Sequence, residues 1–441
     1  MTAPAGWTQL RLKYTVLSIR NGVWGDEPTG DATNVRCIRA ADFDRTHLKA
    51  VPDSAPYRRL TAAQLCQNAL EMGDLVLEKS GGGDTQPVGL VVLFDDAETA
   101  VCSNFAARIR VRQGFDSRYL CYLHAHLYAA GINTKSIKQN TGIQNLDAGS
   151  YFDERVDLAP SAEQRVIADF LDRETEQIDA LVAKKQRLIE LLQEERTAVI
   201  SHTVTKGLDP EAPMKDSGIE WLSRMPAAWE VRRLKQLTEF VTSGSRGWAE
   251  FYADEGPIFI RITNLDRKSV DLELSNVQHV NPPVGSEGER TRVRAGDVLV
   301  SITADVGTVG IVPDGLGAAY VNQHTALIRP QSSSVEPRWL ALALHSGVGQ
   351  RQFAALLQGG TKLGLNLDDV RNLIVPVPPL ADQRRLMRHI DDAGERLGTL
   401  SATVSSALER LREHRSALIT AAVTGQIDVG ARKARRQAER P

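Results

Sequence analysis

Two short patterns in this sequence contain residues that could carry chemistry if the fold brought them together. Asn281-Pro-Pro-Val284 nearly matches the Asn-Pro-Pro-aromatic motif of enzymes that methylate adenine. Such enzymes stack an aromatic side chain on the extruded base, which Val284 cannot do, and no glycine-rich cofactor loop follows an N-terminal strand. The pattern therefore favours a turn with two prolines.

The second pattern could hold a divalent metal. Asp254 and the segment Asp266-Arg267-Lys268 imitate the spaced acidic residues and lysine with which some nucleases bind magnesium. Another Asp-Arg pair, at Asp44-Arg45-Thr46, lacks the lysine, so a salt-bridged loop is the better interpretation. Ser80-Gly-Gly-Gly-Asp84 is not followed by Gly-Lys-Ser/Thr, which excludes a nucleotide-binding loop and indicates a flexible hairpin or a close approach of backbone to DNA.

Cysteine and histidine spacing gives no sign of metal binding. The four cysteines form no CxxC pair, which predicts free thiols in a reducing compartment. His124 and His126 alternate beside Cys121, and we interpret them as helix surface or core. We therefore expect no catalytic residue, no cofactor and no metal in this chain.

Length, composition and net charge limit the classes of protein to which this chain could belong. The 441 residues suggest two or three domains, and 42% hydrophobic with 24% charged residues is typical of a soluble globular chain. The chain has no apolar run that could span a bilayer and no N-terminal leader, so we expect a cytoplasmic protein. The formal net charge of −2 argues against a uniformly basic surface, and we interpret the basic tail as a solvated end.

The strongest signal is an internal repeat, because the second half of the chain repeats the first at a shift of about 220 residues. Small changes in loop length account for the drift in this shift. The matched residues include Trp7 with Trp229, Gly22 with Gly244, Arg39 with Arg261, Gly73-Asp74 with Gly296-Asp297, Arg110 with Arg329, and Gln164 with Gln383. The repeat covers essentially the whole chain, so one module is duplicated.

Each module has a globular part and a long helix. Short β-like runs and the helical patches at 117–130 and 337–357 predict globules of the α+β class. Beyond each globule, apolar residues recur in steps of four and three for about five heptads. Two such stripes most simply bury each other in an antiparallel coiled coil, and a lone amphipathic helix lying on a core is the alternative.

These patterns predict two globular domains related by a pseudo-twofold axis and joined by the two long helices. The predicted segments are a first globular domain at 1–158, a spacer helix at 159–206, a linker at 207–227, a second globular domain at 228–378, a second spacer helix at 379–425 and a basic tail at 426–441. Two unlike heads on a rigid spacer suit a ligand with two sites at a fixed distance, as duplex DNA presents.

Four parts of the chain carry a resemblance to a known family. The central linker at 205–231, the stretch at 376–384 before the second long helix, and the Ile260-Arg261 and Gly296-Asp297 pairs resemble parts of type I restriction-modification specificity subunits. The similarity spans the full chain and includes its duplicated layout. It implies two target-recognition domains that each read half of a split DNA site, with the paired helices setting the gap between the halves.

The resemblance also implies that the reactive chemistry belongs to partners. Members of the family bind double-stranded DNA and two modification subunits, which methylate adenine with S-adenosylmethionine, and often two restriction subunits, which cleave using ATP and magnesium. Such a complex serves in phage defence. One departure is that Leu158-Ala-Pro-Ser-Ala-Glu-Gln164 differs from Val377-Pro-Pro-Leu-Ala-Asp-Gln383, so partner contacts at the two helix starts need not be equivalent.

Candidate DNA contacts are basic and amide side chains of the heads, because phosphate contacts give affinity and paired hydrogen bonds to base edges give discrimination. We expect residues matched by the repeat to stabilise the fold or contact phosphates, and unmatched residues to specify sequence. The candidates are Arg36, Arg39, Arg58, Arg59, Lys135 and Lys138 in the first head and Arg246, Arg261, Asn264, Arg267, Lys268 and Lys362 in the second.

Two other functions stay open on the sequence alone. One is a stand-alone methyltransferase or nuclease with its own active site, which only the two weak patterns support. The other is a purely structural coiled-coil adaptor, which would leave two whole heads without a purpose.

Overall fold

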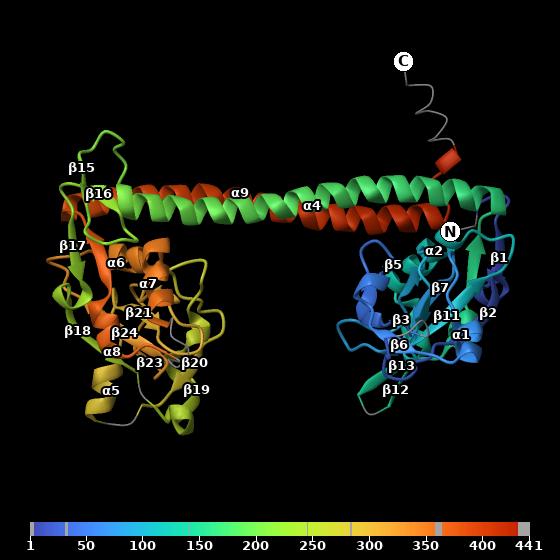
Figure 1. Cartoon of the computed structure of the whole chain (residues 1–441), viewed down its shortest axis with the longest axis horizontal. Coiled ribbons are helices and arrows are strands. Elements are labelled where there is room, and N and C mark those ends of the chain that lie inside the picture. Colours follow the sequence, from blue (N-terminus) through green and yellow to red (C-terminus); the bar gives the residue numbers. More distant parts are fainter. Residues whose placement is uncertain are drawn as a thin grey trace, which may run out of the picture. The chain divides into compact units, whose positions relative to one another are not determined.

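The computed structural model describes residues 4–30, 34–140, 142–244, 246–282, 285–357 and 364–430 (Figure 1). The candidate Lys362, the end of the Asn281–Val284 pattern and the tail beyond residue 430 lie outside these ranges. The chain divides into two compact units, the first formed by Met1–Lys185 with Ser406–Pro441 and the second by 186–405. Each unit therefore combines one globular head with half of each long helix.

The head of the first unit is built on a six-stranded sheet in the order β2-β11-β7-β9-β5-β4. Its central strand β7 pairs antiparallel with β11 and β9, and all four β7 residues are buried. Helix α2 (Ser117–Ala129) begins at Asp116, whose carboxylate accepts hydrogen bonds from the backbone N–H groups of Arg118 and Tyr119. The sheet strands are β2 (Val16–Asn21), β11 (Ala106–Val111), β7 (Leu75–Glu78), β9 (Val91–Leu93), β5 (Lys49–Ala50) and β4 (Phe43–Asp44).

Three smaller sheets complete this head. They have the orders β1-β14, β10-β3-β6 and β12-β13-β8. The elements are β1 (Thr8–Arg11), β3 (Asn34–Ile38), β6 (Tyr57–Arg59), α1 (Ala62–Asn68), β8 (Ser80–Gly81), β10 (Ala100–Cys102), β12 (Ile137–Asn140), β13 (Ile143–Leu146), α3 (Ala148–Phe152) and β14 (Arg155–Leu158). The predicted α+β class is confirmed. Cys37, Cys102 and Cys121 are buried and Cys66 is exposed, and all four are free in the structure.

The head of the second unit repeats this plan with a four-stranded sheet in the order β18-β24-β21-β22 and a smaller sheet β20-β19-β23. The hairpin β15-β16 lies in the linker, and the described residues of the first unit contain no equivalent hairpin. The elements are β15 (Met214–Asp216), β16 (Arg224–Pro226), β17 (Glu230–Arg233), β18 (Thr238–Ser243), β19 (Tyr252–Ile260), β20 (Gln278–Val280), α5 (Ser286–Thr291), β21 (Val298–Ser301), β22 (Val309–Ile311), β23 (Ala319–Val321), β24 (Thr325–Pro330), α6 (Pro337–His345), α7 (Gly347–Leu357), α8 (Leu367–Asn372) and β25 (Ile374–Val377).

One pair of glycines shows how closely the two heads correspond. A Cβ atom on Gly22 would lie 2.1 Å from the backbone oxygen of Cys102, and a Cβ atom on Gly244 would lie 2.0 Å from that of Val321. Both distances are far inside van der Waals contact, so each position accepts only glycine. The repeat seen in the sequence is therefore a repeat of backbone packing.

The long helices are α4 (Ser161–Lys206) and α9 (Leu380–Val423), within two residues of the predicted bounds. In the first unit, Ile167 and Leu171 of α4 share a hydrophobic core with Leu418 and Ile419 of α9. In the second unit, the far end of α4 shares a core with the beginning of α9, through Ile200, Val204, Leu386 and Ile390. The two helices therefore run antiparallel, as predicted (Figure 1).

The apolar stripe is not buried along its whole length. Leu181 is 43% exposed in the first unit, and Leu188 and Leu400 are 37% and 45% exposed in the second. Ile167, Leu171, Leu386 and Ile390 of the stripe are buried where they also share the core of a head, whereas Val404 is buried on α9 outside those cores. Burial along the stripe is therefore uneven, which the heptad pattern alone does not predict. No helix in the described residues is long and apolar enough to cross a membrane.

Candidate nucleic-acid interface

The Gly-Asp pairs of the repeat, Gly73-Asp74 and Gly296-Asp297, are each joined to one arginine of the matched pair Arg110 and Arg329. The Arg110 guanidinium donates to both carboxylate oxygens of Asp74, at 3.1 and 3.0 Å. The Arg329 guanidinium does the same to Asp297, at 2.8 and 2.7 Å. Both aspartates are almost fully buried, so these bidentate pairs hold the sheet together and leave no cation free for a ligand.

The matched candidates Arg39 and Arg261 begin equivalent turns. The backbone N–H of Arg39 donates to Asp42, and that of Arg261 donates to the side-chain oxygen of Asn264. Asn264 is 1% exposed, and its amide also donates to the backbone oxygens of Glu273 and Asn276. With both ends of its amide used and no exposed surface, Asn264 serves the loop, and in this conformation it has no group to offer a base.

The Arg39 side chain is also committed to the fold, because its guanidinium makes two hydrogen bonds of 2.9 Å to Asp42. Burial raises the pKa of Asp42, but the hydrogen bonds from Arg39 outweigh it and hold the pKa below its usual value. The Arg261 side chain is half-buried, and its Nε atom has no hydrogen-bond partner within the described residues. Of these two matched arginines, Arg261 is the one with a donor to spare.

Arg36 and Arg58 stack on exposed aromatic rings along β3 and β6. The Arg36 guanidinium lies 4.1 Å from the Tyr57 ring centroid, and the Arg58 guanidinium lies 4.3 Å from that of Trp24. Both arginines also meet acids: Arg36 approaches Glu98 at 3.4 Å and Arg58 approaches Glu27 at 2.6 Å. A phosphate or base would have to displace those carboxylates, whereas the stacked rings would keep the guanidinium planes oriented.

The remaining candidates of the first head border its small sheets. Arg59 pairs weakly with Asp26 at 3.4 Å, and Lys138 on β12 pairs with Asp147 at 2.7 Å. Lys135 lies just before β12, is exposed, and makes no hydrogen bond or ion pair to the described residues. The Ser80–Asp84 segment turns tightly after β8, as the predicted hairpin would, with Gly83 and Gln86 exchanging backbone hydrogen bonds.

In the second head, Arg267 is held by Asp305 on both carboxylate oxygens. Lys268 is exposed, and its backbone N–H donates to Asp266 at 3.0 Å, which makes the nuclease-like pattern a turn in a salt-bridged loop. Arg246 is exposed, and like the ammonium of Lys268 it has no partner among the described residues. Among the candidates that the structure describes, Lys135, Arg246 and Lys268 thus have charged groups with no partner in the described residues; DNA contact by any candidate stays a prediction.

A basic stretch on the first sheet was missed by the sequence reasoning. Arg20 on the edge strand β2 lies opposite Arg108 on β11, and Arg20 is exposed. Arg108 is 5% exposed, and one nitrogen donates to the Ala69 carbonyl while its Nε has no partner in the described residues. Burial and then the charge of Arg110 lower the pKa of Arg108. The alternating arginines at 108 and 110 were the available signal.

Among the described residues, Asp254 and Asp266 of the nuclease-like pattern are not part of a metal-binding cluster. Within the described residues, no cluster of three His, Cys, Asp or Glu side chains could hold a metal ion. His124 is buried and its ring bonds the Tyr151 hydroxyl at 2.8 Å, so it belongs to the core as interpreted. His126 contacts the Thr420 hydroxyl on α9 at 3.0 Å.

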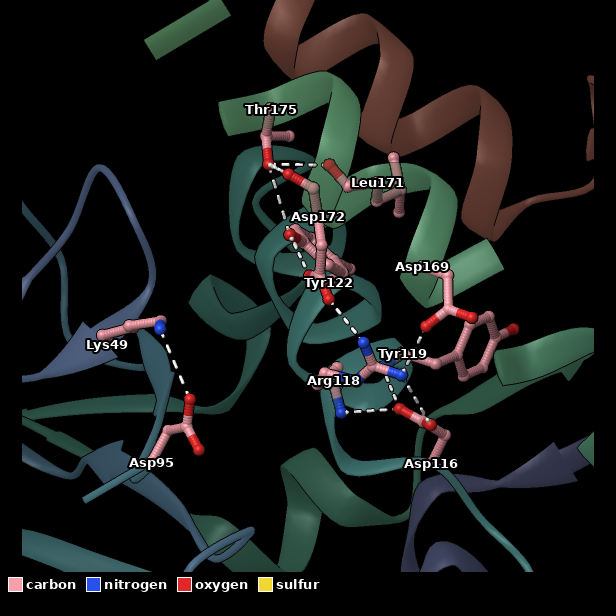
Figure 2. Close-up of polar contacts among 10 residues, drawn as sticks. All are labelled: Lys49, Asp95, Asp116, Arg118, Tyr119, Tyr122, Asp169, Leu171, Asp172 and Thr175. Carbon is pink, nitrogen blue, oxygen red and sulfur yellow. Dashed lines mark hydrogen bonds and ion pairs between the residues drawn. The ribbon is translucent and has the colours of Figure 1, made fainter. Parts of the chain in front are cut away.

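Each head is joined to its helices by a polar cluster. In the first unit, Arg118 of α2 reaches Asp172 and Asp169 of α4 at 2.6 and 2.8 Å, and the Tyr122 hydroxyl donates to Asp172 (Figure 2). In the second unit, Arg338 of α6 reaches Asp391 of α9 at 2.9 Å. The equivalent ion pairs use α4 in one unit and α9 in the other, as the repeat requires.

Known proteins share both the sequence pattern and this architecture. The family described as the type I restriction modification DNA specificity domain matches residues 226–410. The EcoBI specificity subunit of Escherichia coli is 24% identical over 339 residues, which cover 75% of this chain and 70% of the relative. The putative MjaX specificity subunit of Methanocaldococcus jannaschii is 22% identical over 434 residues, 97% of this chain and 95% of the relative.

Solved structures agree in fold. A chain from work on complex assembly and conformational transition of the type I restriction-modification system superposes with a TM-score of 0.73 at 18% identity, covering 97% of this chain and all of that chain. The HsdS subunit of Thermoanaerobacter tengcongensis gives a TM-score of 0.53 at 18% identity, covering 97% of this chain and 99% of its own. In its duplicated heads, its antiparallel helices and these matches, this chain is similar to type I restriction-modification specificity subunits.

Proposed function

We propose that this chain is the DNA-recognition subunit of a type I restriction-modification complex. Each head reads one half of a bipartite site, and α4 with α9 holds the two readers. The observation that carries the proposal is the contrast within the repeat. The buried framework is the same in both heads, as in the Asp74–Arg110 and Asp297–Arg329 pairs, whereas the free surface cations differ.

We assign the methylation and cleavage of DNA to partner subunits. Two modification subunits that bind S-adenosylmethionine would methylate adenine, and restriction subunits using ATP and magnesium would cleave DNA. The chain itself is proposed to be non-catalytic and to act in the cytoplasm. Support comes from relatives named as specificity subunits, since a stand-alone methyltransferase or nuclease would be expected to resemble enzymes instead.

The test is reconstitution of the chain with its modification subunit, followed by footprinting on genomic fragments. The proposal expects protection of a discrete site made of two unlike short sequences separated by a fixed number of base pairs. Methyl transfer from labelled S-adenosylmethionine should need both proteins. Transfer or cleavage by the purified chain alone would instead establish the enzymatic alternative.

A further inference from the structure

One buried glutamine lies at the junction between each head and its long helix. Gln164 lies in the first turn of α4 and is 1% exposed, and Gln383 lies in the first turn of α9 and is fully buried. The side-chain oxygen of Gln164 accepts from the backbone N–H of Asp116 at 3.0 Å, and its nitrogen donates to the backbone oxygen of Ala159 at 2.8 Å. One amide therefore connects the start of the head helix α2 to the segment that leads into α4.

The second unit reproduces this arrangement atom for atom. The Gln383 oxygen accepts from the backbone N–H of Glu336 at 2.8 Å, and its nitrogen donates to the backbone oxygen of Pro378 at 2.8 Å. Asp116 and Glu336 are the N-cap residues of α2 and α6. The half-buried backbone N–H at each of these helix starts would lose this hydrogen bond if the glutamine were removed.

The Arg118 ion pairs act at the first of these junctions, one or two helical turns farther along α4 (Figure 2). The Arg338 ion pair acts at the second, two turns farther along α9. Together, the glutamine and the arginine hold each head helix to its long helix at two separated points. Two separated points fix a direction as well as a position, whereas a single point of attachment leaves a pivot. The junction is therefore built to hold the head at one angle.

We infer that Gln164 and Gln383 are positioning residues that set the angle of each head and thereby the length of the gap between the two half-sites. This inference rests on the proposed function. It separates two properties of recognition: head surfaces choose the base sequence, and the glutamine junctions choose the spacing. Loss of a glutamine should relax the spacing and leave both half-site sequences unchanged.

The second unit offers a matched control in Gln352. This residue is 6% exposed, and its amide exchanges two hydrogen bonds of 2.8 Å with the backbone of Ile374. Both partners lie within the head, on α7 and β25. The Gln352 nitrogen also reaches the backbone oxygen of Val348 at 3.5 Å. Gln352→Leu thus removes at least as many hydrogen bonds as Gln383→Leu without touching the junction.

The first measurement is methylation of a library of sites with varied spacers by the reconstituted complex. Gln383→Leu and Gln164→Leu should lower the preference for the native spacer over spacers one base pair longer or shorter by about tenfold, the effect of one or two lost hydrogen bonds. Gln352→Leu should keep the native preference. Unchanged spacer preference in both junction variants would overturn the inference, as would an equal loss in Gln352→Leu.

The second measurement needs no DNA. Spin labels at Asp314→Cys in the head and Arg396→Cys on α9, in a Cys66→Ser background, report the distance between head and helix within the second unit; both sites are exposed. Gln383→Leu should broaden the distance distribution, and Gln352→Leu should not. If Gln383→Leu does not fold, Arg338→Gln weakens the same junction from the surface.

The two measurements fail in distinguishable ways. If the wild-type complex recognises no bipartite site, the proposed function is wrong, and the label distances still decide whether the glutamines hold the head. If bipartite recognition is present but Gln383→Leu leaves a narrow distance distribution, the positioning role is wrong.

Discussion

Arg415 on α9 donates from Nε to Asp179 on α4 at 2.9 Å, and the two side chains are only 14% and 8% exposed. Removing one partner of such a pair leaves the other charge buried without compensation. Asp179→Ala should therefore lower the free energy of unfolding of the first unit by about 3 kcal/mol. Local amide exchange in α4 and α9 would measure this, and a loss below 1 kcal/mol would show that the helices meet mainly through their apolar residues.

The second unit lacks this ion pair. The repeat matches Arg415 with Arg196 and Asp179 with Gly398, so the acidic partner is replaced by a glycine. A Cβ atom on Gly398 would meet no atom within 4 Å, so a larger residue fits. Gly398→Ala should stabilise the helix by about 1 kcal/mol. Gly398→Asp should add a coupling to Arg196 of the order of 1 kcal/mol. A double-mutant cycle with Arg196→Gln measures the coupling; a value of zero would mean that the repeat does not extend to this contact.

Gly22 and Gly244 test the backbone repeat. Alanine at either position would force Cβ against a carbonyl oxygen at about 2 Å, so the neighbouring strand must move. Each variant should lose at least about 3 kcal/mol of stability or fail to fold. Gly83→Ala is the control, because its Cβ would meet nothing within 4 Å and its φ is not left-handed. Chemical denaturation of the three variants distinguishes close packing from general intolerance of alanine.

His124 should make the first unit sensitive to acid. Burial lowers the pKa of His124 from 6.5 to about 4. Between these pH values the imidazole is protonated in the unfolded chain and neutral in the folded chain. The stability that the neutral ring contributes is complete above pH 6.5 and is lost as the pH falls toward 4, a change of about 3 kcal/mol. His124→Leu, which copies Leu344 of the second head, should remove this pH dependence. An unchanged slope of unfolding free energy against pH would contradict the assignment.

Exposed and buried candidates should behave differently toward DNA. Lys135→Ala and Arg246→Ala each remove a free cation, so each should reduce the salt slope of binding by about 0.9 if the group contacts one phosphate. Asn264→Ala should lower the stability of the second head, by about 2 kcal/mol, without altering that slope. Binding measured across a series of salt concentrations decides; identical slopes in all variants would remove Lys135 and Arg246 from the interface.

Much of the architecture could be predicted because the sequence contains an internal repeat of the whole module. The heptad pattern predicts the first and last residues of α4 and α9 to within two residues. The matched residues Asp74 with Arg110, and Asp297 with Arg329, form buried ion pairs in the structure. Asp42 and Asn264 fill the same turn position in the two heads, and the prediction of Asn264 as a candidate DNA contact did not use this correspondence. The repeat also matches Gln164 with Gln383, but their hydrogen-bond partners can be identified only in the folded structure.

The DNA contacts could not be chosen from sequence, because the partner of an arginine is set by folding. Glu27 lies far from Arg58 along the chain, and Asp305 lies far from Arg267, yet each acid neutralises its arginine. Lys135 and Arg246 look no more suitable than these in the sequence. Their freedom is a property of the surface around them.

The central claim is that two heads read two half-sites independently. The most direct measurement is a map of methylated adenines in cells that express the modification subunit with this chain, repeated after residues 228–378 are exchanged for those of a relative. The account predicts a bipartite motif in which the exchange alters one half and leaves the other half and the spacer unchanged. A single continuous motif, or an exchange that alters both halves together, would contradict it.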